Sequence, residues 1–388
     1  MPLFDGWETV PEDADPLVPK RLGKGGQGEV FLVRSPERVA RRFQADHRGK
    51  MLILGVGHTT DTTAELAKCL MDLGGPDPPE SLGALKKFVI PSDDKNEEAR
   101  AVGRLESEVK ALEALRENPG VLRVQHANVA ARFIITEFHP RGTLDKNLQL
   151  LRGDVLAALL AFKPLVDALC GIHRVGAIHR DIKTENIFLT ASGQLVLGDF
   201  GIVFFQEGTE RLTTTFERVG SHEWMAPWAY RKERVELTKI SPALDIFPMA
   251  KVLWSMIAGR NGFPFWEYTR DENNLERLFP DNPIMALVND RILSTRIVRE
   301  AGECDGSAET LREQVEGLIN YIKDLRGFRP DSVDVWPCKV CGRGKYRRGG
   351  PPKYQIRGFR EGGPESEREQ RFYASICDHC GHAEFFTR

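Results

Sequence analysis

The chain has 388 residues, of which 41% are hydrophobic and 28% charged, as in a globular protein of roughly two or three domains. Its 54 lysines and arginines balance 56 aspartates and glutamates, so bulk charge favours neither a nucleic-acid binder nor a membrane-surface protein. The N-terminus lacks a secretory pattern, and the longest apolar stretch, 155–169, is interrupted by Lys163, Pro164 and Asp167. We therefore expect a cytoplasmic protein without a membrane span.

A glycine-rich segment follows the N-terminal lead-in. Residues 1–20 are rich in proline and acidic residues and are expected to be extended. Strand-like alternation begins near Arg21, and residues 23–30 read G-x-G-x-x-G-x-V. Glycines allow a β-turn-β segment to bring its N–H groups close to phosphates, where a Cβ atom would obstruct. Because a strand rather than a helix follows, the pattern disfavours a dinucleotide-binding turn.

A site that binds nucleotide phosphates also needs a basic residue, and two positions in the sequence offer one. Residues 39–42 follow the pattern V-A-x-K except that Arg42 stands in the lysine position. Residues 84–86 read A-x-K and place a lysine, Lys86, at the end of the pattern. Residues 104–115 have the apolar spacing of an amphipathic helix and place Glu108 a short interval after Lys86. We therefore choose the pair Lys86 and Glu108, and Arg42 remains the alternative.

This choice implies an insertion at about residues 44–82 between two strands. Residues 51–56 are predicted to form a strand, and a capping box of Thr62 and Glu65 is predicted to open a helix that runs to Leu73. The glycines after the predicted strand lack the lysine of a P-loop. We therefore expect an accessory element packed on the surrounding domain rather than a second nucleotide site.

The densest group of chemically capable residues lies at 178–201. It contains the patterns H-R-D-x-K-x-x-N and D-F-G. Asp181 can orient a hydroxyl and accept its proton, and Lys183 can neutralise charge on a transferring phosphoryl group. Asn186 and Asp199 offer the oxygen ligands that Mg²⁺ prefers. Either motif occurs by chance, but both in this order and this close rarely do, so together they indicate a phosphoryl-transfer site.

On these motifs, residues 20–332 resemble a eukaryotic-type (Hanks-type) Ser/Thr protein kinase. Residues 220–227 resemble the end of an activation segment, Asp245 opens a helix pattern that resembles the support of the catalytic loop, and Arg329-Pro330 resembles the pair near the end of that domain. The resemblance implies an α+β, bilobal protein kinase fold with a β-rich N-lobe and a helical C-lobe. The expected divisions are the lead-in 1–20, the N-lobe 21–138 with its insertion, the C-lobe 139–332 and a C-terminal module 333–388.

The resemblance also implies roles, with ATP and Mg²⁺ as cofactors and a protein as substrate. A lysine two residues after the catalytic aspartate is the Ser/Thr pattern, and residues 133–139 would be the hinge that pairs with adenine, with Thr136 as gatekeeper. The expected catalytic residues are Asp181, Lys183, Lys86 and Glu108. The expected nucleotide-binding residues are Gly23, Gly25, Gly28, Val30, Lys86, Glu137, His139, Asn186 and Asp199, of which Asn186 and Asp199 bind Mg²⁺.

The resemblance further implies control by phosphorylation. In such kinases the arginine before the catalytic aspartate, here Arg180, pairs with a phosphorylated activation segment. Thr213, Thr214 and Thr215 are the expected acceptors of autophosphorylation, and each phosphate would add about −1.5 to −2 charge. The alternative is that this run of threonines is only a polar loop.

The sequence departs from the family pattern at Trp228. This residue stands where the glutamate of A-P-E would be, so the ion pair of that glutamate, with Arg329 by analogy, is missing. The change bears on the rigidity of the activation segment and not on the chemistry. A pseudokinase usually lacks the lysine or one of the two aspartates of the site. Lys86, Asp181 and Asp199 are all present, so we expect an active enzyme. An ATP-binding scaffold without transfer and a kinase of small molecules remain the alternatives.

Two C-x-x-C-G motifs lie near the C-terminus, with 35 residues between Cys341 and Cys377. Four thiolates suit tetrahedral zinc, and paired motifs in a chain without an export signal favour zinc over disulfides. With its strand-like flanks the region resembles a zinc ribbon, so Zn²⁺ is a third expected cofactor. Residues 337–388 hold eleven Lys/Arg and six Asp/Glu, too modest an excess to favour nucleic-acid binding, which stays an alternative. The expected zinc ligands are Cys338, Cys341, Cys377 and Cys380.

Overall fold

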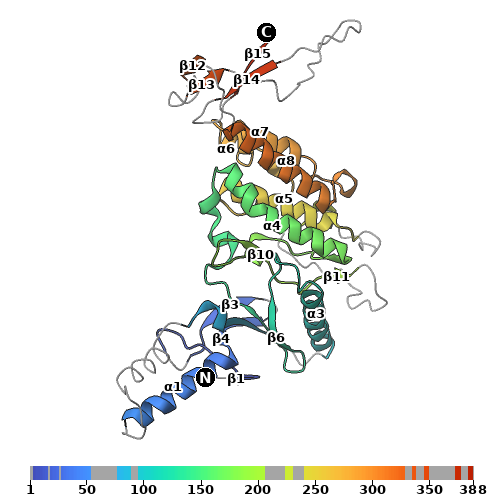
Figure 1. The fold of residues 1–388 in the computed structure, drawn as a ribbon. Helices are drawn as coiled ribbons and strands as arrows, with labels where there is room; N and C mark the ends of the chain where they lie inside the picture. Colours follow the sequence, from blue (N-terminus) through green and yellow to red (C-terminus); the bar gives the residue numbers. More distant parts are fainter. Residues whose placement is uncertain are drawn as a thin grey trace. The chain divides into compact units, whose positions relative to one another are not determined.

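The chain folds into two units in the computed structural model (Figure 1). The described residues are 3–15, 18–25, 28–53, 77–88, 95–205, 223–229 and 240–327, together with four strands near the C-terminus. One unit comprises Met1–Lys146 with Ala168–Val219, and the other comprises Asn147–Asp167 with Gly220–Arg388.

A seven-stranded sheet forms the centre of the first unit. The strand order is β1-β2-β4-β5-β7-β6, β3 also pairs with β4, and every pairing is antiparallel. The strands are β1 (Leu3–Phe4), β2 (Trp7–Thr9), β3 (Arg21–Gly25), β4 (Gly28–Arg34), β5 (Leu82–Phe88), β6 (Val124–Asn128) and β7 (Phe133–Glu137). Helices α1 (Pro36–Ile53) and α3 (Lys95–Ala114) belong to the same unit. The predicted β-rich N-terminal region is confirmed.

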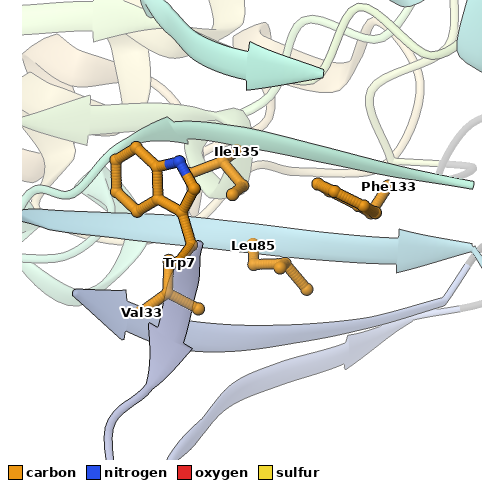
Figure 2. Packing of buried hydrophobic residues seen from close by; sticks show 5 residues of the cluster. All are labelled: Trp7, Val33, Leu85, Phe133 and Ile135. Carbon is orange, nitrogen blue, oxygen red and sulfur yellow. The ribbon is translucent and has the colours of Figure 1, made fainter. Parts of the chain in front are cut away.

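The N-terminal hairpin of β1 and β2 is part of the hydrophobic core. Residues 3–9, expected to be an extended lead-in, add two strands to the sheet through β4. Gly83 lies beneath the hairpin, where a Cβ atom would come within 2.6 Å of Ile135 and 3.0 Å of the Trp7 ring. The absence of a side chain at Gly83 therefore lets the indole approach the sheet closely. The buried cluster around the indole (Figure 2) consists of Trp7, Val33, Leu85, Phe133 and Ile135.

Replacing Trp7 with alanine is expected to lower the free energy of unfolding by about 3 kcal/mol, because a buried aromatic side chain is lost and a cavity is left. Chemical denaturation of the full chain measures the change. Leu3→Ala is the matched control on the same hairpin, since the Leu3 side chain is 63% exposed, and should change stability by less than about 0.5 kcal/mol. Equal stability of the two variants would contradict a core role for the hairpin.

Helix α1 begins the insertion between β4 and β5. Pro36 at its first position and Glu37 in its first turn both favour a helix start. Residues 51–53, predicted to begin a strand, are the end of this helix, and that part of the prediction is wrong. An apolar run of this length fits either structure, and here the helix that starts at Pro36 continues through it. The rest of the predicted strand and the predicted helix 62–73 lie outside the described residues.

Arginines at the start of the insertion bind an aspartate at its end. Arg34 Nε lies 2.6 Å from Asp77 Oδ2, and Arg38 Nε lies 2.8 Å from Asp77 Oδ1. Burial alone would raise the pKa of Asp77, but the hydrogen bonds and charge of these arginines lower it below its ordinary value. Arg42 Nη1 is 3.7 Å from the same carboxylate. Arg42, the alternative to Lys86, therefore lies in a helix at the base of the insertion.

Two short antiparallel pairs frame the predicted catalytic motifs. The H-R-D-x-K-x-x-N motif lies between β8 (Ala177–Ile178) and β9 (Ile187–Leu189), and D-F-G lies between β10 (Leu195–Leu197) and β11 (Phe204–Phe205). Strand β8 pairs with β11, and β9 pairs with β10. The pairing brings the two motifs together at neighbouring strand ends.

Helices dominate the second unit. They are α5 (Ala243–Ala258), α6 (Leu275–Leu278), α7 (Ile284–Val288) and α8 (Ala308–Gly327), and α4 (Val155–Arg174) begins in this unit. Nearly every residue of α5 is buried, which is the pattern of a central core helix. Lys163 of α4 pairs with Glu316 of α8 at 3.1 Å. The predicted helical C-terminal region is confirmed.

Helix α4 is long and apolar enough to cross a membrane when judged by length and composition alone. However, 56% of the apolar window is buried within the protein, and Pro164 interrupts it. Core helices pass the same test, so this one helix is weak evidence for a membrane span.

Two hairpins follow near the C-terminus. Strand β12 (Asp334–Pro337) pairs with β13 (Lys345–Arg348), and β14 (Phe372–Ile376) pairs with β15 (Ala383–Thr387). Strands β13 and β14 also contact each other. The four cysteines of the C-x-x-C motifs lie outside the described residues.

Candidate active site

Three charged side chains from distant parts of the sequence meet in the first unit. Lys86 of β5 places Nζ 3.0 Å from Glu108 Oε2 of α3 and 2.9 Å from Asp199 Oδ1, which follows β10. Alternation along β5 turns Lys86 away from its neighbour Leu85, which belongs to the hydrophobic cluster. Glu108 is only 3% exposed, so α3 holds it inside the unit rather than in solvent. The arrangement fixes one ammonium between two carboxylates.

The charges in this group shift one another's pKa values. Burial alone would lower the pKa of Lys86, but the carboxylates of Glu108 and Asp199 raise it above the ordinary lysine value. Burial raises the pKa of Glu108 despite the attraction of Lys86. Burial also acts to raise the pKa of Asp199, but Lys86 outweighs it and holds that pKa below its ordinary value. Lys86 is therefore a permanent cation at neutral pH.

The loop from 179 to 186 forms a second polar group around Asp181. Lys183 Nζ lies 2.7 Å from Asp181 Oδ2, and the Asn186 amide nitrogen donates to the same oxygen at 2.9 Å and to the Asp181 carbonyl at 2.8 Å. The amide nitrogen of Asn186 is thus used within the loop, which leaves its amide oxygen as the atom suited to a metal. Two donors hold the carboxylate of Asp181 in one orientation.

His179 is a positioning residue that the sequence reasoning did not single out, although it lies in the same motif. Its ring is fully buried and contacts the ring of Phe200 at 4.5 Å. The backbone N–H of Asp181 donates to His179 Nδ1 at 3.2 Å, and His179 Nε2 lies 3.0 Å from the carbonyl of Gly198. Because a carbonyl only accepts, Nε2 carries the ring proton. His179 thereby connects the loop of Asp181 to the residue before Asp199.

Arg180 and Asp199 have left-handed backbone conformations, with φ values of 66° and 58°. Residues other than glycine adopt such values at a cost of order 1–3 kcal/mol, and these residues cluster at functional sites. Arg180 Nε donates to the carbonyl of Ile202 at 2.6 Å, and its guanidinium lies 6.0 Å from the centre of the Phe204 ring. Thr213, Thr214 and Thr215, its expected phosphorylated partners, lie outside the described residues.

The glycine-rich segment is the turn between β3 and β4. Gly23, Gly25 and Gly28 lie in these two strands, and Val30 pairs with Lys86 across β4 and β5. Gly28 has φ of 153°, and a Cβ atom there would overlap the carbonyl of Lys87, so only glycine fits. The turn is therefore attached directly to the strand that carries Lys86.

Strand β7 ends in the segment predicted to be the hinge. The Glu137 carboxylate accepts the backbone N–H of Arg123 at 3.2 Å and lies 3.3 Å from His139 Nε2. Burial acts to raise the pKa of Glu137, but the neighbouring His139 ring and the backbone N–H of Arg123 outweigh it and lower that pKa below its ordinary value. The two side chains thus lie close together, and the backbone of this segment continues directly from the sheet.

Within the described part of the chain, no group of three or more His, Cys, Asp or Glu side chains is placed to hold a metal ion. The expected Mg²⁺ ligands are one carboxylate and one amide, and the expected zinc ligands fall outside those residues. The donor chemistry of Asn186 and Asp199, two oxygen ligands, fits a hard cation shared with phosphates.

Comparisons with known proteins match most of this region. The model of the protein kinase domain family matches residues 79–315, which begins just before β5 and includes all of the charged groups above. The glycine-rich segment, helix α1 and the C-terminal cysteines lie outside that match.

Several curated proteins are similar to the chain. The serine/threonine-protein kinase PknL of Mycobacterium tuberculosis is 29% identical over 168 residues, which cover 43% of this chain and 38% of PknL. The CBL-interacting serine/threonine-protein kinase 24 of Arabidopsis thaliana is 30% identical over 164 residues, 41% of this chain and 35% of that protein. Protein kinase C epsilon type of Oryctolagus cuniculus is 26% identical over 265 residues, 68% of this chain and 32% of that protein. The matches thus span between 32% and 38% of the length of each of these relatives.

Proposed function

The chain belongs to the protein kinase domain family, and from this premise we propose that it transfers the γ-phosphate of ATP to serine or threonine hydroxyls of proteins. The observation that carries the proposal is the coincidence of two polar groups in one unit. One is Lys86 between Glu108 and Asp199, and the other is Asp181 held by Lys183 and Asn186. A site for phosphoryl transfer needs both, because one group positions the nucleotide and the other the hydroxyl.

Each residue has a distinct task in this proposal. Lys86, fixed by Glu108, binds the α- and β-phosphates, and the glycines of the β3–β4 turn cover the phosphates. Asn186 and Asp199 are the residues that would hold Mg²⁺, which when bound neutralises charge on the β- and γ-phosphates. The substrate oxygen bonds to the γ-phosphorus, the bond to ADP breaks, and Asp181 accepts the proton of the hydroxyl. Lys183 stabilises the charge that develops on the transferred group.

The Ser/Thr preference and autophosphorylation are finer parts of the same proposal. Lys183, two residues after Asp181, supports the preference for serine and threonine. Arg180, adjacent to Asp181, and the three threonines at 213–215 support phosphorylation of the activation segment. A phosphate on this segment would gain charge-assisted hydrogen bonds from an arginine.

Intact-mass spectrometry of the purified chain before and after Mg²⁺-ATP tests the proposal. We expect the mass of one or more phosphates to be added, and fragmentation to place at least one of them within 213–215. A radiolabelled assay with dephosphorylated casein tests transfer to another protein. No transfer in either assay would contradict the proposal and favour an ATP-binding scaffold.

We also propose that the C-terminal cysteines bind zinc. The strand pairing supports this, because Pro337 faces Lys345 and Ile376 faces Ala383 across their hairpins. Each C-x-x-C motif thus lies in the sequence between two paired strands, and β13 of one hairpin contacts β14 of the other. Two cysteine pairs carried by adjacent hairpins are the donor set of a structural zinc site.

Elemental analysis of the dialysed full chain is expected to find about one zinc ion per molecule. The double change Cys338→Ser and Cys341→Ser should remove it, because two thiolates are too few to retain the metal. Cys304→Ser is the matched control, since burial raises the pKa of the Cys304 thiol to about 12 and keeps it protonated. Zinc retained by the double variant, or absent from the unchanged protein, would contradict this proposal.

A further inference from the structure

Lys251 is a fully buried lysine on α5. Its Nζ donates to three backbone carbonyl oxygens, those of Glu223, Phe263 at 2.7 Å and Phe265 at 3.1 Å. In the part of the chain that the structure describes, no carboxylate forms an ion pair with it. Aromatic rings complete the surroundings, and the nearest, that of Phe263, has its centre 4.6 Å from Nζ.

The three carbonyl oxygens around Lys251 Nζ suit an ammonium group better than an apolar side chain. An ammonium has three N–H donors and no acceptor, and three carbonyls face it. Burial lowers the pKa of Lys251 to about 7, and only the charge of Glu223 opposes this shift. An apolar residue would avoid that cost, as the neighbouring Val252 and Leu253 do. The lysine is therefore explained by the carbonyls that it binds.

These carbonyls belong to two segments that α5 joins. Glu223 opens the described segment 223–229, which lies in the sequence region that resembles the end of an activation segment. Phe263 and Phe265 lie in the loop after α5. The same segment is attached to α5 a second time by Trp228, whose ring packs edge-on against Phe247 at 5.5 Å.

Trp228 is also the position at which the family pattern has a glutamate. The ion pair of that glutamate is missing, yet residues 223–229 still have a defined attachment to α5 through Lys251 and Trp228. The lysine supplies the polar part of this attachment, and the indole supplies the apolar part.

We propose that Lys251 is a positioning residue that holds the end of the activation segment in the absence of the usual ion pair and so sets the affinity for the protein substrate. This inference rests on the proposed kinase function. The residues assigned to ATP lie between 23 and 199, outside the segment that Lys251 binds. The effect is therefore expected on the protein acceptor and not on ATP.

Lys251→Met in the full chain tests the proposal by two measurements. Hydrogen–deuterium exchange of the amides in 223–229 should become about tenfold faster, because the loss of the lysine's hydrogen bonds lowers the free energy of local opening. The KM for dephosphorylated casein should rise about tenfold while the KM for ATP stays unchanged. Lys251→Gln, which keeps two N–H donors, should give intermediate values. Lys163→Met, which removes an ion-paired lysine from α4, is the control and should match the unchanged protein.

Two outcomes would overturn the proposal. One is unchanged exchange in 223–229 together with an unchanged KM for casein in Lys251→Met. The other is a uniform rise in exchange over α5 and α8 with equal changes in both KM values, which would show a general packing role. If the unchanged protein phosphorylates nothing, the proposed function fails by itself, and the exchange of 223–229 still decides whether Lys251 holds this segment.

Discussion

Replacing Asp181 with asparagine is expected to reduce phosphate transfer by about 10²–10⁴-fold, the usual contribution of a positioned general base. The substitution keeps the size and the oxygen that can accept from Lys183 and Asn186, but it removes the group that takes the proton. Binding of ATP should change little, because Lys86, Asn186 and Asp199 are retained. Initial rates with radiolabelled ATP and casein measure the transfer, and calorimetric titration measures ATP binding.

Asp167→Asn is the matched control for the loss of a carboxylate. Asp167 lies in α4, where its carboxylate forms an exposed ion pair with Lys163 at 2.8 Å. Exposed pairs of this kind contribute about 0.3–0.5 kcal/mol, so this variant should keep its activity. If Asp181→Asn retains the full rate, Asp181 is not the base. If it loses ATP binding as well, the change has disturbed the loop rather than the chemistry.

Replacing Lys86 with methionine is expected to lower the rate of transfer by about 10²–10³-fold and to weaken ATP binding. The structural reason is that Glu108 and Asp199 would then face each other without the cation between them. The pKa of Glu108, which burial already raises, should rise further, since the attraction of Lys86 is removed. The carboxyl would carry its proton at higher pH than in the unchanged protein.

Arg42→Met separates the two residues that the sequence offered for this role. Arg42 lies near Asp77 at the base of the insertion, and Lys86 lies between the two carboxylates of the site. We therefore expect Arg42→Met to keep nearly full activity. Loss of activity in Arg42→Met with full activity in Lys86→Met would reverse the assignment. Steady-state kinetics of both variants with ATP varied at a fixed casein concentration decide the question.

The proximity of the candidate site residues could be predicted from the sequence because most of them lie in short motifs with fixed spacing. Asp181, Lys183 and Asn186 lie within six consecutive residues, so their local geometry depends little on the rest of the fold. The distant members, Lys86 and Glu108, required a choice between two basic residues. The interval to the glutamate favoured Lys86, and the structure places the two side chains 3.0 Å apart.

Features that depend on long-range packing could not be predicted. Residues 3–9 lie in the acidic, proline-containing lead-in 1–20, and nothing local shows that Trp7 packs against strands more than twenty residues away. Residues 51–53 were assigned to a strand on their apolar character, whereas the helix start at Pro36 decides their structure. Lys251 is one lysine in an apolar helix, and only the fold brings three carbonyls to it.

The pairing of β4 with β5 bears on what the insertion costs the fold. The two strands pair along their whole length, from Gly28 opposite Phe88 to Arg34 opposite Leu82, so the sheet itself brings the ends of the inserted segment together. Closing a flexible loop costs only about 0.6 kcal/mol more for each doubling of its length. By this entropy alone, a change in chain length between α1 and Asp77 would cost little free energy. Evolution could enlarge the segment at this position without disturbing the strand that carries Lys86.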